Sequence, residues 1–371
     1  MRRTAHVVVI GAGVIGCAVA YEIARRGGRV RVIDRRDVGK GSTQASAGVL
    51  APYLTAHEGS PILGLGARSL ALYDEFVSRV VEDSGSTVQY VRSGTLEVAL
   101  NAQEAGKLEA VQRVYAEMGA EVEFLDQNAV HAAEPQLSED IQAGLAVGGH
   151  GYVAAADLTK ALRRAAGAYG VTFAAATSAT RILSVGGSMR VETGAENLSC
   201  DAVVMAAGSW SGQVEAEGEE PVPIRPVRGQ LLHLDWPMSP PDRVIWTDRC
   251  YLVPWNDGSV LVGATVEEVG FDERATVAGV QELLGLACRV APNAGKAWFR
   301  DVRVGLRPGT PDNLPAIGPS PNLPGLIYAT GHFRNGVLLA PLTAAMVADL
   351  VLDEKRDAAL DATAPGRFKP D

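Results

Sequence analysis

The chain has 371 residues, of which 47% are hydrophobic and 21% charged, and its formal net charge is −9. This length exceeds that of an ordinary single domain, so we expect two domains that share a core. The acidic balance argues against nucleic acid as a partner, because nucleic-acid binding needs a basic face.

Neither a signal peptide nor a membrane span is expected. The N-terminal run Val7–Ile10 ends at a glycine and predicts a buried strand rather than a secretory segment. No segment has the roughly 18 unbroken apolar residues of a spanning helix. The most apolar stretch, 337–352, is interrupted by Pro341 and Asp349 and predicts a core helix.

Cysteine and histidine spacing indicates neither a disulfide framework nor a metal site. The cysteines show no CxxC pair and the histidines no HxH or HxxxH pair. This usage fits a protein of the reducing cytoplasm. The widely scattered cysteines are Cys17, Cys200, Cys250 and Cys288.

Taken in chain order, the predicted elements begin and end as a nucleotide-binding unit with β-rich material between. Strands over 5–10 and 29–33 flank a helix that follows a glycine turn, and a long helix is expected over 64–83. The middle of the chain predicts mostly short strands, with helices over 103–118, 157–169 (with Asp157 as its cap) and 275–290. A strand over 326–329 and a final helix return to the first pattern. A nucleotide domain completed by the C-terminus, with a β-rich insertion, explains this order best.

The first motif is the glycine turn Gly11-Ala12-Gly13-Val14-Ile15-Gly16, which directly follows a hydrophobic strand. Gly11 permits the tight turn, Gly13 lets the backbone approach a pyrophosphate, and Gly16 lets helix and strand pack closely. Asp34 ends the second strand, where an acid accepts hydrogen bonds from ribose hydroxyls. The motif does not choose between NAD and FAD.

Three further turns are rich in small or polar residues. The loop 41–49 (GSTQASAGV) offers hydroxyls near the pyrophosphate turn, although its composition also suits an ordinary loop. A second turn contains Ala207 and Gly208. The third, 331–338 (GHFRNGVL), opens the final helix, whose unpaired N–H groups would suit the negative charge of a reduced flavin.

Together these motifs resemble the glycine oxidase group of the D-amino acid oxidase family. GAGVIG, GSTQASAG, MAAGSWSG, CYLVPWNDGSVLVGAT, VGLRPGTPDNLPAIG and GHFRNGVLLAP occur in this order over nearly the whole chain. The resemblance implies an α/β fold of two domains: a Rossmann-like FAD-binding domain of the p-hydroxybenzoate hydroxylase type, and an inserted antiparallel substrate domain. The expected ranges are 1–86, 148–222 and 305–371 for the first domain, and 87–147 and 223–304 for the second.

The resemblance also implies a non-covalent FAD and a set of residues that line it. Beside the residues of the glycine turn, these are Asp34, Arg35, Ser42, Thr43, Ala47, Gly48, Val49, Ala179, Ala207, Gly208, His332, Phe333, Arg334, Asn335, Gly336, Val337 and Leu338.

For the substrate, the resemblance implies that Arg307 binds a carboxylate, that Tyr251 bonds the same group or closes the pocket, and that Arg334 lies at the amine side. A guanidinium in an apolar stretch is costly to bury without such a partner, although an internal salt bridge would also serve. Tyr251 could equally be a core residue with its hydroxyl at the rim. No general base is assigned.

The implied reaction is oxidative deamination of glycine or a small N-substituted glycine. A hydride passes from the α-carbon to flavin N5, an imine forms, and O₂ is reduced to H₂O₂. Relatives suggest a homotetramer or homodimer and a role in thiamine precursor supply. Three alternatives stay open: an oxidase of a larger N-carboxymethyl amino acid in secondary metabolism, a quinone-linked dehydrogenase, and a non-catalytic FAD-binding subunit of a larger oxidase complex.

Three positions depart from the glycine oxidase pattern and suggest a larger substrate. Arg249 stands where a histidine is often found, and Val49 and Val266 stand where methionine can occur. The valines would enlarge the pocket, and Arg249 would add a cation near its mouth. Neutral drift at an exposed rim is the alternative.

Overall fold

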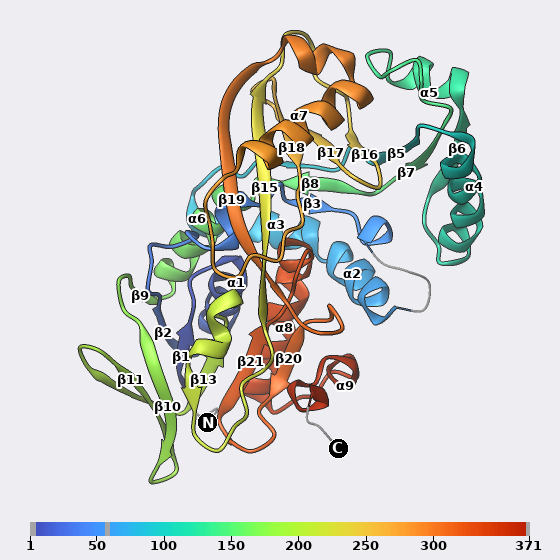
Figure 1. The fold of residues 1–371 in the computed structure, drawn as a ribbon. Coiled ribbons are helices and arrows are strands. Elements are labelled where there is room, and N and C mark those ends of the chain that lie inside the picture. Colours follow the sequence, from blue (N-terminus) through green and yellow to red (C-terminus); the bar gives the residue numbers. More distant parts are fainter. Residues whose placement is uncertain (1–4, 56–59, 369–371) are drawn as a thin grey trace.

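A six-stranded sheet forms the lower half of the molecule in the computed structural model, which describes residues 5–55 and 60–368 (Figure 1). Its strands, in spatial order, are β20 (Ala316–Pro319), β21 (Leu326–Thr330), β13 (Ala202–Met205), β1 (His6–Ile10), β2 (Arg29–Ile33) and β9 (Thr172–Ala174). All neighbours are parallel except β20 and β21. The sheet therefore unites strands from both ends of the chain, in the order typical of a nucleotide-binding fold.

The helix α1 (Val14–Arg25) follows β1 and packs against α8 (Gly336–Asp353) and α6 (Ala155–Ala168). Its small and apolar residues are almost all buried, and Gly27 in a positive-φ conformation ends it. Among the described residues, α8 alone is long and apolar enough to cross a membrane, but 61% of it is buried inside the protein. It lies against α1 and α2 (Pro61–Ala71) as a core helix.

An eight-stranded sheet forms the upper half of the molecule (Figure 1). Its strands, in spatial order, are β19 (Trp298–Gly309), β15 (Arg225–Asp235), β18 (Ser259–Gly263), β17 (Tyr251–Pro254), β16 (Val244–Trp246), β5 (Thr95–Ala99), β7 (Ala143–Val147) and β6 (Val122–Asp126). The helix α7 (Val277–Val290) packs on β15 and β18, and α4 (Ala102–Glu117) packs on β5, β6 and β7.

Two smaller sheets and several short elements complete the fold. The sheets are β12 (Asn197–Cys200), β11 (Ser188–Thr193), β10 (Ala179–Val185) and β14 (Glu215–Ala216), and β3 (Val49–Leu50), β8 (Gly151–Val153) and β4 (Tyr90–Val91). The short helices are η1 (Ser42–Ala45), η2 (Tyr53–Thr55), α5 (Gln127–Ala133), η3 (Gly208–Gln213), η4 (Pro292–Lys296), α9 (Leu360–Thr363) and η5 (Pro365–Phe368).

Two local predictions were wrong. The single helix expected over 64–83 is two helices, α2 and α3 (Tyr73–Ser84), because Leu72 bonds back to Ser69 in a tighter turn and breaks the α-helical pattern. The expected cap Asp157 lies inside the first turn of α6, where it pairs with Lys160 at 3.1 Å; Ala154 is the N-cap.

The strand β19 of the eight-stranded sheet packs against η1, the short helix that follows β2 of the six-stranded sheet. A Cβ at Gly305 would lie 2.9 Å from the Cβ of Ala45, so only glycine allows this approach. Two hydroxyls, from Ser42 and from Ser209 (2.8 Å), donate to the carbonyl of Leu306 and hold the strand there. We propose that each large sheet is the centre of one of the two domains predicted from the sequence.

Candidate active site

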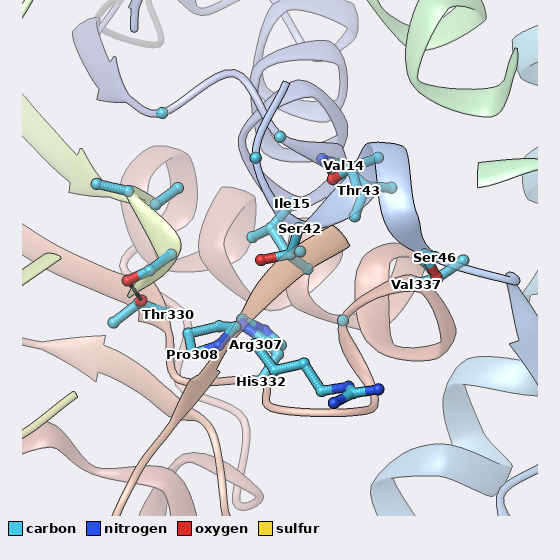
Figure 2. A pocket seen from close by; sticks show the side chains of 18 of the residues that line it. Val14, Ile15, Ser42, Thr43, Ser46, Arg307, Pro308, Thr330, His332 and Val337 are labelled. Atoms are coloured by element: carbon cyan, nitrogen blue, oxygen red, sulfur yellow. Dashed lines mark hydrogen bonds between the residues drawn. The ribbon is translucent and has the colours of Figure 1, made fainter. Parts of the chain in front are cut away.

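A cavity of about 390 Å³ lies between the two large sheets. It is lined by the glycine turn after β1, the end of β2, the η1 loop, the turn after β13, and the start of α8. Tyr251 and Arg307 line it from the eight-stranded sheet, and Figure 2 shows Arg307 in this position. Its volume is in the range of ligand-binding clefts.

The three glycines of the turn have different roles. Gly11 has φ 111°, and a Cβ there would overlap the carbonyl of Ala206 in the turn after β13. A Cβ at Gly16 would overlap the carbonyl of Gly11, so this glycine lets α1 pack on the turn. A Cβ at Gly13 would meet only the hydroxyl of Thr43, at 3.4 Å. Gly13 is therefore the position that keeps the cavity side open.

The hydroxyls of η1 differ in what they can still bind. Thr43 Oγ1 accepts a hydrogen bond from the Val14 N–H at 3.1 Å, so its own proton can be donated to a ligand oxygen. Ser42 donates its proton to Leu306. Because the first N–H groups of α1 have no partner within the helix, the turn and Thr43 together have the donors that a phosphate group needs.

Asp34 fastens the end of β2 to the glycine turn. Its two carboxylate oxygens accept hydrogen bonds from the Ala12 N–H at 2.6 Å and the Arg36 N–H at 2.8 Å. Burial raises the pKa of Asp34 and the two backbone bonds oppose this rise. A carboxylate oxygen has a second lone pair, so Asp34 can also accept from a ligand hydroxyl.

The start of α8 is fixed by the residues that precede it. Phe333 adopts a positive φ of 47° and donates its N–H to the Pro308 carbonyl at 2.9 Å. His332 is buried against Thr343, with 3.1 Å between the ring Nε2 and the hydroxyl, and burial lowers its pKa to about 3. The ring is therefore neutral at neutral pH. The positive end of the α8 dipole, at Gly336–Leu338, lines the cavity.

The guanidinium of Arg307 lies flat against Gly229 on the neighbouring strand β15, so closely that a Cβ there would overlap it. Its Nη1 donates to the carbonyls of Thr265 (2.9 Å) and Arg228 (3.4 Å). No carboxylate of the described residues forms an ion pair with it, so an internal salt bridge is not found there. Burial lowers its pKa. A largely buried cation that has only carbonyl partners among the described residues is suited to bind an anion from outside.

Tyr251 and Trp246 form one wall of the cavity. Their rings are stacked, with centroids 5.2 Å apart and planes 17° from parallel. The Tyr251 ring packs on Gly263, where a Cβ would overlap it. Burial raises the pKa of Tyr251, and the nearby cations Arg307 and Arg334 oppose this rise.

The comparisons with known proteins identify the family. The model of the FAD-dependent oxidoreductases called DAO matches residues 6–350. The chain is 32% identical to a glycine oxidase of Geobacillus kaustophilus over 97% of this chain and 96% of that protein.

The chain belongs to the DAO family of FAD-dependent oxidoreductases.

Solved structures of the family superpose closely on this fold. Glycine oxidase from Geobacillus kaustophilus gives a TM-score of 0.94 at 30% identity, covering 99% of this chain and 100% of that one. Iminodiacetate oxidase from Chelativorans sp. BNC1 gives 0.87 at 26% identity, covering 97% and 98%. The chain also matches a bifunctional protein ThiO/ThiG of Synechocystis sp. at 34% identity over 99% of this chain, but it spans only 55% of that protein.

The DAO family cofactor, FAD, fits the residues of the cavity. Gly13 leaves room for a pyrophosphate, Thr43 has a proton to donate, and Asp34 can accept from ribose. The start of α8 offers N–H donors and a positive dipole at the opposite side, beside Arg307 and His332 (Figure 2). The cavity therefore has donors for phosphate at one end and for a flavin ring at the other.

Most of the predicted site residues come together in this cavity. Gly16 lies behind the turn rather than in the lining. The lining residues among those predicted are Gly11, Gly13, Val14, Ile15, Asp34, Arg35, Ser42, Thr43, Ala47, Gly48, Val49, Ala179, Ala207, Gly208, Tyr251, Arg307, His332, Phe333, Arg334, Asn335, Gly336, Val337 and Leu338.

Two predicted pocket residues do not line the cavity. Val266 is 53% exposed, because Thr265 before it turns inward to bond the Gln230 N–H at 2.9 Å. Arg249 lies in the turn before β17 and forms an exposed ion pair with Glu282 of α7 at 2.8 Å. Of the three departures from the glycine oxidase pattern, only Val49 therefore faces the cavity.

Sequence reasoning missed several lining residues. Arg36 follows Asp34 by two positions, and Trp210 lies within the quoted motif MAAGSWSG, so both had a signal in their motifs. Trp246, Gly229 and Gly305 belong to strands, and only the pairing of those strands brings them to the cavity.

Proposed function

We propose that this chain is an FAD-dependent oxidase of a glycine-type amino acid. The observation that carries the proposal is the position of Arg307. Its guanidinium lines the FAD cavity and packs on Gly229, and its only hydrogen-bond partners among the described residues are backbone carbonyls. A planar guanidinium binds a carboxylate through two parallel hydrogen bonds. The substrate therefore carries a carboxylate beside its reacting amine.

The side chains of the chain orient the substrate rather than exchange protons with it. Arg307 binds the carboxylate, and Tyr251 closes the cavity above it with Trp246 behind its ring. Because the carboxylate is held in place, the α-carbon faces the cofactor. The binding energy of the carboxylate thus offsets the entropic cost of orienting the substrate for reaction. Bound FAD would supply the two-electron acceptor for the hydride of the α-carbon, so that the product would be an imine and O₂, as final acceptor, would give H₂O₂.

No residue of the described lining is placed as a general base. Asp34 is the one carboxylate in that lining, and it is bonded to backbone N–H groups of the glycine turn. His332 is neutral and bonded to Thr343. The substrate must therefore enter with a neutral amine, and we expect the rate to rise with pH toward the amine pKa of the substrate.

The relatives support glycine itself and N-substituted glycines as candidate substrates. Two named relatives are a glycine oxidase and an iminodiacetate oxidase, and iminodiacetate is a glycine with a second carboxymethyl group on nitrogen. Val49 lines the cavity, and we propose that its short side chain accommodates a substituent on the substrate nitrogen. A quinone-linked dehydrogenase is less well supported, since the proline dehydrogenase neighbour, at 21% identity, shares the fold alone.

A substrate screen of the FAD-loaded enzyme tests the proposal. Oxygen uptake and peroxide release are measured with glycine, sarcosine, N-ethylglycine, iminodiacetate, and the D- and L-forms of alanine and proline. We expect peroxide in proportion to oxygen with glycine or an N-substituted glycine. Activity with none of these compounds, or flavin reduction without oxygen consumption, would contradict the oxidase proposal.

We further propose a place in thiamine precursor supply, a homo-oligomeric state and a reducing compartment. The ThiO/ThiG relatives support the role in thiamine precursor supply, although the chain spans about half their length.

The state of the cysteines supports the reducing compartment. All four cysteines are free, and burial raises the pKa of Cys17 and Cys200. Light scattering of the purified protein tests the oligomeric state, and growth of a thiamine-requiring deletion strain carrying this chain tests the pathway.

A further inference from the structure

The loop between β18 and α7, residues 264–276, extends from the eight-stranded sheet to the end of β2 in the six-stranded sheet. There the Glu273 carboxylate accepts two hydrogen bonds from the Arg36 guanidinium, at 2.9 and 2.6 Å. Arg36 stands two residues after Asp34 and lines the cavity. The loop is therefore bonded to the part of the cavity near Asp34, which we call the ribose end of the FAD site. The two bonded residues, Arg36 and Glu273, lie far apart in the sequence.

An aromatic contact joins the same two parts of the chain. The guanidinium of Arg36 lies over the Trp210 ring, with 4.3 Å from Cζ to the ring centroid. The ring of Phe271, from the loop, lies 5.9 Å from the Trp210 ring. Trp210 comes from η3, and it lines the cavity beside Arg35 and Arg36. Phe271 and Glu273 thus both touch residues that face the cofactor, while they do not line the cavity themselves.

The base of the loop is anchored independently of this contact. Arg228, which is buried, donates to Glu267 at 2.5 Å and to the Arg274 carbonyl at 3.1 Å. Gln230 donates to the other oxygen of Glu267 at 2.7 Å. Loss of the Arg36–Glu273 pair would therefore detach the tip of the loop from Arg36, while the base of the loop stays folded.

We propose that the 264–276 loop is a clasp that retains FAD, closed by the Arg36–Glu273 pair and the Phe271–Trp210 contact. The loop contacts Arg36 and Trp210 on the side of these residues that faces away from the cavity. FAD therefore dissociates more slowly while the loop holds these contacts. This inference rests on the FAD assignment of the cavity and not on which amine is oxidised. A partly exposed ion pair and an aromatic ring contact of this kind each change a rate by about threefold to fivefold.

The release rate of FAD from the holoenzyme tests the clasp. Release is followed by the rise of flavin fluorescence after dilution, with no substrate present, for Glu273→Gln, Phe271→Ala and the double variant. We expect about fivefold faster release for each single variant and a larger increase for the double variant. Salt should speed release from the wild type more than from Glu273→Gln, because the ion pair is screened.

Two control variants on the same loop separate the clasp from general loosening. Glu268→Gln removes an exposed pair with Arg225, and Arg274→Ala removes an exposed pair with Asp272. Neither side chain touches Arg36 or Trp210, so both should release FAD at the wild-type rate. Release at the wild-type rate in all three clasp variants would overturn the proposal, as would equal acceleration in the controls. A protein that retains FAD but oxidises no amine would leave this result standing and would contradict only the proposed function.

Discussion

Gly229 on β15 is the surface on which the Arg307 guanidinium rests, because a Cβ at this position would overlap the guanidinium. The strand pairing that places Val227 opposite Arg307 lets the side chain fold back over its neighbour strand. A glycine in a strand marks a close approach of this kind. The position of the proposed carboxylate anchor thus depends on a residue that touches no substrate.

Gly229→Ala should therefore displace Arg307 and weaken carboxylate binding. We expect KM for the amino acid to rise about tenfold or more, since a displacement of about 1 Å at a binding group is costly. FAD affinity should change little. The measurement is steady-state peroxide release, with Gly167→Ala as control, because a Cβ at Gly167 on α6 meets open space. An unchanged KM would show that Gly229 does not position the anchor.

Thr43 and Ser42 should contribute unequally to FAD binding. Thr43→Val removes the acceptor for the Val14 N–H and the proton offered to a phosphate. We expect the Kd of FAD to rise about 10-fold or more, the size of a lost hydrogen bond to a charged group. Thr43→Ser should bind FAD nearly as the wild type does. Ser42→Ala loses its bond to Leu306 instead and should change the Kd less. Titration of the apoprotein measures all three, and a larger effect of Ser42→Ala would contradict the assignment.

Val49 should limit the size of the substituent on the substrate nitrogen, whereas Val266 should not. Val49→Met fills part of the cavity, so kcat/KM for N-ethylglycine should fall about tenfold relative to glycine, as expected for a mismatch of one or two carbon atoms. Val266→Met is the matched control, because Val266 is 53% exposed and outside the lining. Equal effects of the two substitutions would mean that Val49 does not border the substrate.

Buried histidine should make stability depend on pH below neutrality. His150 is fully buried, with its Nδ1 2.9 Å from the Thr95 hydroxyl, and burial lowers its pKa to about 3. The unfolded chain binds a proton at an ordinary histidine pKa of about 6.5, so between these values unfolding takes up a proton. The free energy of unfolding is therefore highest above about pH 6.5 and falls on acidification, by up to about 1.4 kcal/mol per pH unit for this residue.

His150→Gln should reduce this pH dependence. Chemical denaturation of the apoprotein at pH 5.0, 5.5, 6.0 and 6.5 gives the slope of the unfolding free energy. We expect a smaller slope in the variant than in the wild type. The slope that remains in the variant includes the contribution of His332, whose pKa is also lowered by burial. A slope equal to that of the wild type would mean that His150 is charged in the folded protein.

The sequence predicts those parts of the site that depend on local chemistry. The turn from Gly11 to Gly16 and the acid Asp34 follow from the βαβ pattern, because φ angles, helix dipoles and strand ends are set within some thirty residues. The final helix and the glycine-rich turns were predicted near their observed positions for the same reason.

Long-range strand pairing decides the rest and is not visible in local patterns. Gly229 and Trp246 reach the cavity only because β15 pairs with β19 and β16 pairs with β17. Val266 was misplaced because the alternation of β18 ends at Gly263, after which Thr265 turns inward. Arg249 was misplaced because an exposed partner, Glu282, lies on a helix more than thirty residues away in sequence.

The role of Arg307 as carboxylate anchor is tested most directly by comparing glycine with methylamine in two enzymes, the wild type and Arg307→Gln. Peroxide release gives kcat/KM for the four combinations, so the contribution of the carboxylate is measured with and without the guanidinium. We expect the wild type to favour glycine by at least about 100-fold and the variant to lose most of this preference, as charge-assisted hydrogen bonds of this kind predict. A glycine preference that is unchanged in Arg307→Gln would contradict the account.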